Sequence, residues 1–380
     1  MTVFAVRNAP TLRTIKTSPN SLCTKLLSEE DHVSSSRPDG SRDGRQAGDV
    51  AAVSGRKEPQ PTPPSSYGGL MILVVGATGV LGQRTVRLLL AEGHRVRAMT
   101  RAAERAANLQ RQGAEVVIGD LIDPPSLATA CRGVSRVFAA AHGFLGRGRY
   151  PSEAVDDAGH RALIDAARAE GVKRFVYTSA FGASPNHPID FYRTKYRIEQ
   201  YLQVSGLDYV ILRPSAFMEW HAHTFNGKGL IEKGRTQLLG SGTKPRNFVA
   251  TSDVAHFAVS ALTSPDIQQR ILDIGGPGNF SNNEVAALYA RTLGIEPRVG
   301  HLPALLVGFL AKVARPFHPG LGRLMQLSSL PDDAFPESFD ATRLTQVARD
   351  HAFQLTSLED FVREQVAQAR RRADSPGERT

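Results

Sequence analysis

The sequence predicts a doubly wound parallel α/β fold with a smaller, mostly helical lobe toward its C-terminal end. Three observations predict it. Short apolar segments alternate with amphipathic segments from Met71 onward. The spacing suits parallel strands joined by helices that cover both faces of one sheet. A glycine-rich turn, at residues 76–82, directly follows the first apolar segment.

The expected strands are short and rich in β-branched residues, as buried parallel strands are. We place them at residues 71–76, 95–100, 114–120, 134–141, 173–180, 208–215 and 271–276. The expected helices carry apolar residues at helical spacing, and several end at a glycine, which accepts the left-handed conformation there. We place them at residues 80–93, 102–113, 124–133, 152–172, 190–206, 251–262 and 281–294. Ser281 and Glu284 form a capping-box pattern at the start of the last helix.

The chain is expected to contain four parts. Residues 1–70 are rich in Ser, Pro, Gly, Arg and Asp without hydrophobic periodicity, so we expect a disordered leader. Residues 71–294 form the nucleotide-binding domain, with substrate-lobe insertions after residue 214. Residues 295–369 form the helical lobe, and residues 370–380 a disordered tail.

The leader has two interpretations. Its first 28 residues contain basic and hydroxyl residues but no acid, a composition typical of transit peptides. Met71, however, coincides with the first residue of the first strand. We therefore favour an upstream extension without chemistry and a cytoplasmic protein, with import into an organelle as the alternative.

Composition excludes several classes of function. The 380 residues are 41% hydrophobic and 22% charged, which is typical of a globular protein. The net charge of +9 comes from cations interspersed with acids; the tight cluster is Arg370–Arg372, so we expect no nucleic-acid partner. Two cysteines cannot build a disulfide framework or a thiolate metal site. We expect a reducing compartment and no metal.

One apolar stretch, Pro303–Ala314, is the longest in the chain. It is too short to span a bilayer, and it contains Lys312. We predict a buried or surface-docking helix rather than a peripheral membrane contact, and no integral membrane segment.

The glycine turn predicts a dinucleotide site. Gly76, Gly79 and Gly82 lie between a strand and a helix, where glycines permit a tight turn, close backbone approach to a pyrophosphate, and close packing of helix on strand. The helix N-terminus offers unpaired N–H groups to phosphate. This context indicates a Rossmann fold. The expected phosphate-binding residues are Gly76, Thr78, Gly79, Val80, Leu81 and Gly82.

The end of the second strand indicates which dinucleotide binds. A carboxylate there selects the ribose hydroxyl of NAD, whereas an arginine accommodates the 2′-phosphate of NADP. This strand ends at Thr100 and Arg101, and the next acid is Glu104. A guanidinium suits phosphate. We predict NADP(H), with Arg101 as the determinant and Arg105 as its assistant.

Four motifs carry a resemblance to a known family. They are VVGATGVLG (74–82), GDLIDPPSL (119–127), GVKRFVYTSA (171–180) and GLDYVILRPSAFME (206–219). With these, residues 71–294 resemble the atypical short-chain dehydrogenases/reductases, in particular the NmrA-like NAD(P)-binding group. The resemblance implies that Asp120 and Leu121 border the adenine, and that Ala139 and Ala140 line the path to the nicotinamide. It also implies that Pro214, Ser215 and Phe217 border the carboxamide and the substrate mouth.

The sequence departs from this family at one position. Its hydride-transfer enzymes usually carry Tyr-x-x-x-Lys, in which the tyrosine is the general acid or base and the lysine lowers its pKa and holds the nicotinamide ribose. Lys195 is present, but Phe191 stands four residues before it. Tyr192 is one residue displaced, a rotation of about a third of a helical turn, so it replaces the tyrosine only with local rearrangement.

Two functions remain open. In the first, the protein is an NADPH-dependent oxidoreductase of an apolar carbonyl-conjugated or quinone-like small molecule. The candidate catalytic residues are then Lys195, Ser179 and Tyr192, and Lys195 is the main one and also contacts the cofactor. In the second, the protein binds NADP(H) without catalysis, as a redox sensor, regulator or assembly scaffold. A sugar-nucleotide epimerase ranks third, and a homodimer is left open.

Polar residues near the expected cleft have simpler interpretations. His187 and Asp190 precede the helix that carries Lys195 and are within reach of a substrate, but Asp190 equally suits a helix N-cap. His221 and His223 do not share a helical face and have no acidic or sulfur ligand nearby, so we predict no metal site.

Overall fold

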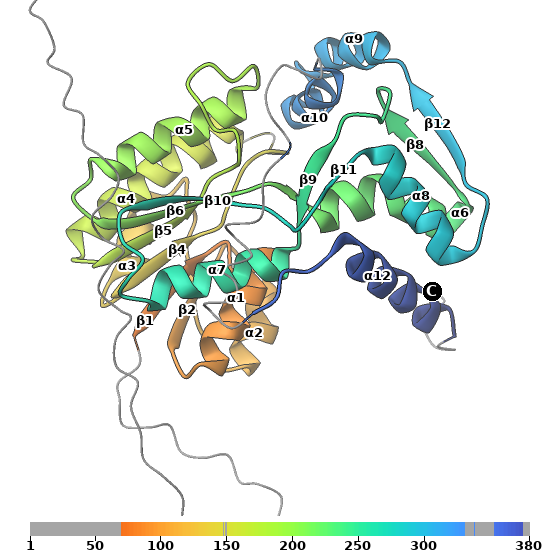
Figure 1. Ribbon diagram of the computed structural model, residues 1–380. Helices are drawn as coiled ribbons and strands as arrows, with labels where there is room; N and C mark the ends of the chain where they lie inside the picture. Colours follow the sequence, from red (N-terminus) through yellow and green to blue (C-terminus); the bar gives the residue numbers. More distant parts are fainter. Residues whose placement is uncertain (1–69, 147, 149, 331–337, 339–352, 375–380) are drawn as a thin grey trace, which may run out of the picture. The chain divides into compact units, whose positions relative to one another are not determined.

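The computed structural model describes residues 70–330, except 147 and 149, together with residues 338 and 353–374 (Figure 1). These residues belong to the compact unit Pro63–Thr380. The predicted leader up to residue 69 and the last six residues of the predicted tail lie outside the described residues.

A seven-stranded parallel sheet forms the centre of this unit, in the order β10-β6-β5-β4-β1-β2-β3. Its strands are β1 (Met71–Val75), β2 (Arg95–Thr100), β3 (Glu115–Ile118), β4 (Arg136–Ala139), β5 (Arg174–Thr178), β6 (Asp208–Pro214) and β10 (Arg270–Ile274). The chain order reverses at β1 and β4, and ligands bind at such a switch point in this class of fold. The predicted doubly wound fold is confirmed.

Helices cover both faces of this sheet (Figure 1). One face carries α3 (Pro124–Cys131), α4 (His160–Ala169) and α5 (Asp190–Gln203). The other carries α1 (Val80–Ala91), α2 (Ala107–Arg111), which follows the 3-10 turn η1 (Ala103–Ala106), and α7 (Thr251–Thr263). The central strands β1 and β4 are buried on both faces, which explains their largely apolar sequence, whereas the edge strands β3 and β10 are more exposed.

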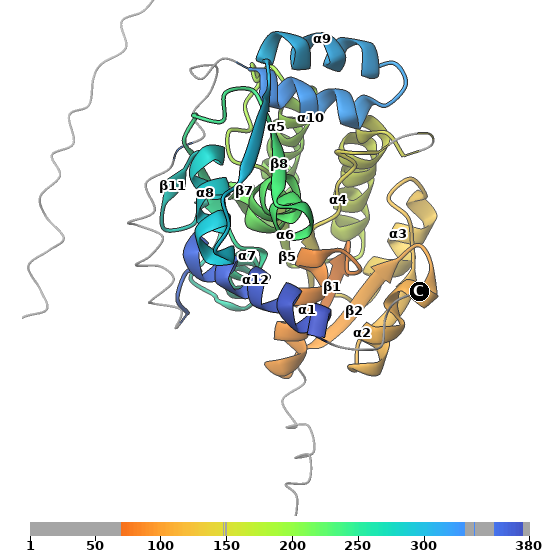
Figure 2. The same ribbon diagram turned by 90° about the vertical axis from the view of Figure 1, so that its right-hand side faces the viewer.

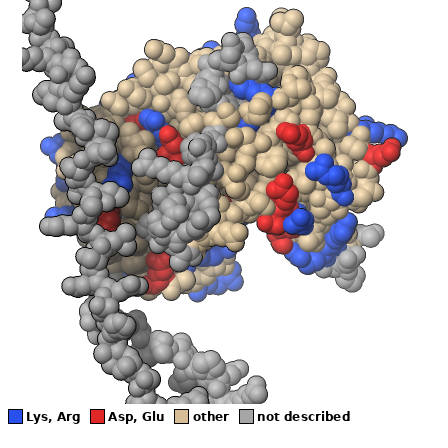
Figure 3. All heavy atoms as spheres, in the orientation of Figure 1, with Lys and Arg blue, Asp and Glu red and all other residues tan. Residues whose placement is uncertain are grey.

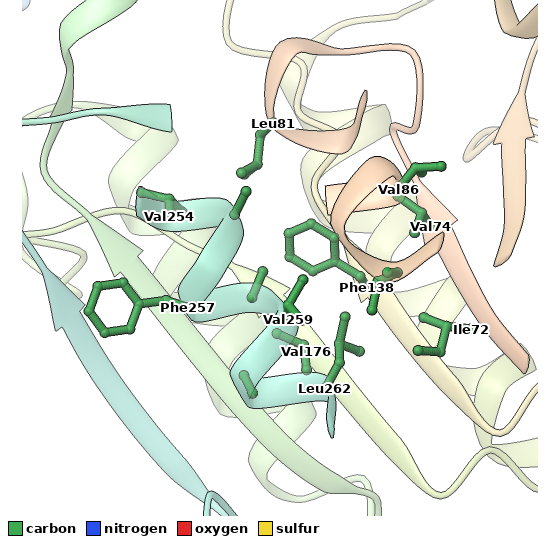
Figure 4. Close-up of a cluster of buried hydrophobic side chains, with 14 of the residues drawn as sticks. Ile72, Val74, Leu81, Val86, Phe138, Val176, Val254, Phe257, Val259 and Leu262 are labelled. Atoms are coloured by element: carbon green, nitrogen blue, oxygen red, sulfur yellow. The ribbon is translucent and has the colours of Figure 1, made fainter. Parts of the chain in front are cut away.

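The core on the α1–α7 side shows how the layers fit. Phe138 of β4 and Val176 of β5 point from the sheet toward Val259 and Leu262 of α7 (Figure 4). All four side chains are buried. Burying side chains of this size contributes about 1.5–3 kcal/mol each, so these contacts hold α7 firmly on the sheet.

The predicted helix at residues 152–172 is two elements. Residues Glu153–Gly159 form a π-helix, η2, and α4 begins at His160. The backbone N–H of Gly143 binds the carboxylate of Asp156 inside this wider turn. Gly159 packs so closely on Leu121 that a Cβ would lie 2.9 Å from its carbonyl oxygen. Such turns occur often at functional sites.

The chain after β6 builds a second layer of structure beside the sheet. It contains β7 (Ala216–Phe217), the π-helix η3 (Met218–Gly227), α6 (Lys228–Lys233), β8 (Arg235–Leu239), β9 (Arg246–Val249), β11 (Asn279–Phe280), α8 (Asn282–Leu293), β12 (Arg298–Leu302) and α12 (Leu358–Asp374). Strands β11-β9-β7 form one small sheet, and β12-β8 another. The predicted capping box of Ser281 and Glu284 is confirmed.

Helix α12 packs against α8 through a shared apolar cluster that includes Tyr289 and Val362. Thr356, just before it, donates its N–H and hydroxyl to Asp253 of α7, each at 2.8 Å. The helix continues through Arg370–Arg372. Those three arginines are therefore helical, and placing them in a disordered tail was wrong. The expected domain boundary at residue 294 stays a prediction.

Helices α9 (Ala304–Ala314) and α10 (Pro319–Ser329) form a pair at one edge of the molecule (Figures 1 and 2). In α9 only Val307 and Ala311 are buried, so the longest apolar stretch is a surface helix. Among the described residues, no helix is both long enough and apolar enough to cross a membrane.

Candidate cofactor and substrate site

The glycine turn after β1 is shaped for close contact. Gly76 has a φ of +86°, and a Cβ there would lie 2.7 Å from the backbone nitrogen of Ala141. A Cβ on Gly82 would lie 2.2 Å from the carbonyl oxygen of Gly76. The turn is closed by the N–H of Gly79, which donates to Gly76 O at 3.0 Å. Glycines at positions 76, 79 and 82 keep the backbone at the start of α1 free of Cβ atoms at these three positions, which fits a closely bound pyrophosphate.

A cavity of about 460 Å³ extends from this turn across the carboxyl ends of the strands. The cavity is lined by many of the site residues predicted from the sequence: Gly76, Gly79, Val80, Leu81, Gly82, Ala140, Ser179, Tyr192, Lys195, Pro214, Ser215 and Phe217. Its other walls are mainly aromatic or aliphatic, and include Phe144, Phe181, Phe191, Trp220, Phe225, Leu324 and Leu327. This volume and lining are typical of sites for small molecules with apolar rings.

Lys195 reaches this cavity from α5 while its side chain is buried. Its Nζ donates to the carbonyl oxygen of Thr178 at 3.1 Å and lies 3.8 Å from Oδ1 of Asp156. Burial lowers the pKa of Lys195 below its usual 10.5, while the anions Asp156 and Glu199 raise it. The ammonium group is thus held by acceptors on one side and faces the cavity on the other.

Asp156 is a site residue that no sequence pattern indicated. It is completely buried, and it accepts the N–H of Gly143 at 3.1 and 3.0 Å and the hydroxyl of Ser152 at 2.5 Å. Gly143 lies in the loop after β4, whose residues His142 and Phe144 line the cavity. Asp156 therefore fixes this loop and balances the charge of Lys195 with the same carboxylate.

Two further buried side chains lie behind Lys195. Its Nζ is 4.8 Å from the centre of the Tyr177 ring, which meets the His160 ring edge-on at 5.3 Å. Burial lowers the pKa of His160 to about 4, so the ring is neutral at neutral pH. Burial raises the pKa of Tyr177 well above its usual value. Both side chains are therefore uncharged near neutral pH, and neither adds a charge beside Lys195.

Ser179 lies at the end of β5, as predicted, but its hydroxyl is engaged. It donates to Oε1 of Glu199, a buried carboxylate that also forms a bidentate pair with Arg213, with Nε at 2.8 Å. A planar guanidinium holds both carboxylate oxygens in a fixed geometry. Ser179 is therefore held in one rotamer at the cavity wall.

Phe191 and Tyr192 both face the cavity. The Phe191 ring lies 5.3 Å from Lys195 Nζ and meets Phe144 edge-on at 4.9 Å. The Tyr192 ring stacks on His187 at 4.1 Å. The position four residues before Lys195 is thus an apolar wall. The catalytic roles of Ser179 and Tyr192 stay predictions.

The predicted adenine-side residues lie in a separate group. The guanidinium of Arg101 stacks over the Tyr150 ring at 4.5 Å, and the Tyr150 hydroxyl donates to Asp120 at 2.9 Å. Leu121 and Ala139 are buried in the core beside them. The carbonyl oxygen of Thr78 accepts from the side chain of Gln83 at 2.9 Å, which braces the glycine turn.

Helix α10 closes the cavity from the side of α5. Its Leu324 and Leu327 are lining residues. Arg323 of α10 holds Asp190, the first residue of α5, through Nε–Oδ1 at 2.7 Å and Nη2–Oδ2 at 3.2 Å. Asp190 therefore anchors α10 to the start of α5. It is the first residue of α5 and not its N-cap, which is Ile189.

The two histidines of η3 face different neighbours. His221 lines the cavity, whereas Nδ1 of His223 lies 3.1 Å from the Tyr289 hydroxyl. Within the described part of the chain, no group of three or more His, Cys, Asp or Glu side chains is placed to hold a metal ion.

Comparison with known proteins decides the family. A family model described as NAD(P)H-binding matches residues 76–265, from the glycine turn to the end of α7. The chain belongs to this NAD(P)H-binding family. The predicted resemblance to the NmrA-like atypical short-chain dehydrogenases/reductases and the predicted nicotinamide cofactor are confirmed.

Relatives of this NAD(P)H-binding protein have different names. It is 33% identical over 225 residues to NAD(P)H azoreductase of Xenophilus azovorans, covering 59% of this chain and 74% of that enzyme. It is 31% identical over 240 residues to photosystem II assembly factor Ycf39 of Guillardia theta, covering 63% of this chain and 76% of that protein. The relatives of this chain thus include one protein named as an azoreductase and one named as an assembly factor.

The fold matches a solved reductase. The structure of an NADPH-dependent quinone oxidoreductase from Escherichia coli, complexed with NADPH, superposes with a TM-score of 0.63 at 21% identity. The match covers 78% of this chain and 99% of that enzyme. At this identity the likeness shows the shared fold.

Proposed function

We propose that this protein is an NADPH-dependent reductase of apolar quinone-like or carbonyl-conjugated molecules. The observation that carries the proposal is the position of Lys195, a buried ammonium group at the wall of a largely aromatic cavity that begins at the glycine turn. The cavity offers flat apolar surface for a ring system and one cation for an oxygen of the acceptor.

The residues fit a nicotinamide dinucleotide. The glycine turn and the first turn of α1 would hold the pyrophosphate, and Arg101 would bind a 2′-phosphate. Lys195, Pro214 and Ser215 would border the nicotinamide ribose and carboxamide. When bound, the reduced cofactor supplies a hydride, and the acceptor gains two electrons and two protons overall.

Lys195 has two roles in this reduction. Its charge stabilises the negative oxygen that develops when the carbonyl or quinone is reduced, and its N–H donates the proton to that oxygen. Thr178 O fixes the direction of Nζ, and the Asp156 carboxylate favours the charged form of Lys195 by opposing the lowering of its pKa by burial. Phe191 stands where related enzymes usually carry a tyrosine that donates a proton, so in this proposal Lys195 is the proton donor to the acceptor oxygen.

The acceptor is held by rings rather than by charge. Phe144, Phe191 and Phe217 form apolar walls, and Leu324 and Leu327 close the side. Excluding water from such a site strengthens the interaction between Lys195 and the developing oxyanion.

This proposal is tested with the full chain, NADPH and a panel of quinones, enones and azo dyes. Oxidation of NADPH is followed by its absorbance, with matched reactions in NADH. We expect turnover with at least one apolar quinone or enone and a preference for NADPH. Tight NADPH binding without turnover of any acceptor would refute it.

A second function has support in two observations. The relative from Guillardia theta is named as an assembly factor, and the family position usually held by a catalytic tyrosine is Phe191 here. A non-catalytic NADP(H)-binding scaffold or sensor needs the nucleotide pocket and a partner surface. It predicts partner binding that changes with NADPH occupancy.

A further inference from the structure

Helix α9 presents an apolar face to solvent. Leu305, Phe309 and Val313 follow one another at a spacing of four residues, so they form one stripe along the helix. Leu305 is 90% exposed and Phe309 62% exposed. Phe317, in the turn to α10, is 85% exposed. Leu306 and Leu310 widen the stripe.

The opposite face of α9 packs against α10. Val307 and Ala311 are buried, and Gly322 of α10 packs so closely that a Cβ would lie 3.2 Å from Ala311 O. The apolar stripe is therefore not needed to hold α9 in place. An exposed run of this kind marks an interaction surface.

The charged side chains of the α9 segment itself are of one sign. Between Glu296 and Asp332 the sequence contains no acid, and Lys312 and Arg315 lie exposed beside the stripe; Arg315 also lies 3.5 Å from Oδ2 of Asp190 on α5. Figure 3 shows no acidic side chain at the edge where α9 lies. Apolar side chains flanked by cations are typical of helices that lie in the plane of a membrane surface.

The charges also disfavour a second copy as the occupant. A two-fold contact between two α9 faces would bring the cations of one copy toward those of the other, with no acid in this segment to balance them. An anionic lipid surface supplies the opposite charge and an apolar layer for the rings.

We propose that the α9 face docks on an anionic lipid bilayer, with Leu305, Phe309, Val313 and Phe317 entering the headgroup region and Lys312 and Arg315 contacting lipid phosphates. This goes beyond the proposed reaction and replaces our expectation against a peripheral membrane contact. Helix α10 lines the cavity and packs against α9. When α9 docks on the bilayer, α10 therefore lies between the cavity and α9 at the membrane surface.

Vesicle co-sedimentation of the full chain tests this surface. The probes are vesicles of phosphatidylcholine alone and vesicles of phosphatidylcholine and phosphatidylglycerol in equal parts. We expect binding to the anionic vesicles, little binding to the neutral ones, and weaker binding as salt is raised. Replacing both Leu305→Ser and Phe309→Ser should weaken binding roughly tenfold or more, because two inserted side chains are lost.

One control variant and one further test variant make the result specific. Val204→Ser removes another largely exposed apolar side chain, at the end of α5, and should leave vesicle binding unchanged. Lys312→Glu should weaken binding to the anionic vesicles selectively. NADPH affinity, measured for every variant, reports that the fold is intact.

Three outcomes would overturn the proposal. They are absence of binding to anionic vesicles, binding that survives in the double variant, and binding that falls as much in the Val204→Ser control. A concentration-dependent dimer that the double variant abolishes, without vesicle binding, would assign the face to a second copy instead.

Discussion

Nζ of Lys195 lies 3.8 Å from Oδ1 of Asp156, and both side chains are buried. A buried ammonium group is costly unless a counter-charge and hydrogen-bond acceptors accompany it. Here Asp156 supplies the charge, and Thr178 supplies an acceptor. The same carboxylate binds Gly143 N–H, so the group that balances Lys195 also shapes the cavity loop after β4.

Replacing Asp156→Asn tests this coupling. Burial already lowers the pKa of Lys195, and Asp156 raises it, so removing the anion lowers the pKa further. Reductase activity requires the protonated form in our proposal, so the alkaline limb of the pH profile of kcat/KM should move to lower pH. We also expect a loss of kcat on the order of tenfold or more, because part of the acid catalysis is lost.

Asp157→Asn is the matched control for that change. It lies on the same π-helix but pairs with Arg161 and Arg197 at the surface. Its pH profile should match the wild type. An unmoved alkaline limb in Asp156→Asn would show that Asp156 does not set the protonation of Lys195.

Arg323→Ala should loosen α10 from α5. Burial raises the pKa of Asp190, but the hydrogen bond and charge of Arg323 outweigh it, so the pKa lies below its usual value. The interaction therefore stabilises the fold above the unfolded pKa and is lost as pH falls through the folded one. We expect a loss of about 1–2 kcal/mol at neutral pH, measured by urea unfolding.

The difference between wild type and Arg323→Ala should shrink as the pH is lowered through the range where Asp190 becomes protonated. Arg315→Ala is the control, because Arg315 lies 3.5 Å from Asp190 and is largely exposed. It should cost less than about 0.5 kcal/mol. Equal losses in both variants would contradict the special role of Arg323.

Gly82→Ala should abolish NADPH binding more completely than Gly79→Ala. A Cβ at Gly82 would lie 2.2 Å from Gly76 O, whereas one at Gly79 would lie 3.3 Å from it. The first change must displace the turn or the helix, and the second needs a small adjustment. Calorimetric titration of both variants with NADPH measures the order. Stronger binding by Gly82→Ala than by Gly79→Ala would contradict it.

Arg101→Ala tests the choice of cofactor. Arg101 is exposed and stacks on Tyr150, whose hydroxyl binds Asp120, the residue that we predict to border the adenine. The variant should lose roughly tenfold or more in NADPH affinity, because a charge-assisted contact is worth about 1.5–3 kcal/mol, and NADH affinity should change little. Arg111→Ala, on α2, is the control. Equal losses for both cofactors would show that Arg101 does not read the 2′-phosphate.

The sequence predicted the elements that local pattern determines. Buried parallel strands and the glycine turn carry their own signals, because strand burial and backbone geometry restrict the residue types there. Predicted residues that line the cavity, such as Gly76, Lys195 and Phe217, followed from those elements and from the family motifs, whereas the lining residues His142 and Phe144 of the loop after β4 did not. Strand ends were less accurate: the expected strands at 114–120 and 134–141 stop at Ile118 and Ala139.

Contacts between distant segments were not predictable in this way. Asp156 meets Lys195 across 39 residues, and it does so from a π-helical turn that leaves no periodic signal. Arg323 meets Asp190 across 133 residues. The apolar pattern of α9 suits a buried helix as well as an exposed one, so its surface position had to come from the structure.

One measurement tests the central claim most directly: single-turnover reduction of an apolar quinone by the full chain loaded with NADPH, comparing wild type with Lys195→Met. Methionine keeps the apolar length of the side chain and removes the charge and proton. We expect Lys195→Met to bind NADPH, though more weakly, and to lose roughly 100-fold or more in the rate of reduction. Reduction at the wild-type rate would contradict the account, because Lys195 would then not act on the acceptor.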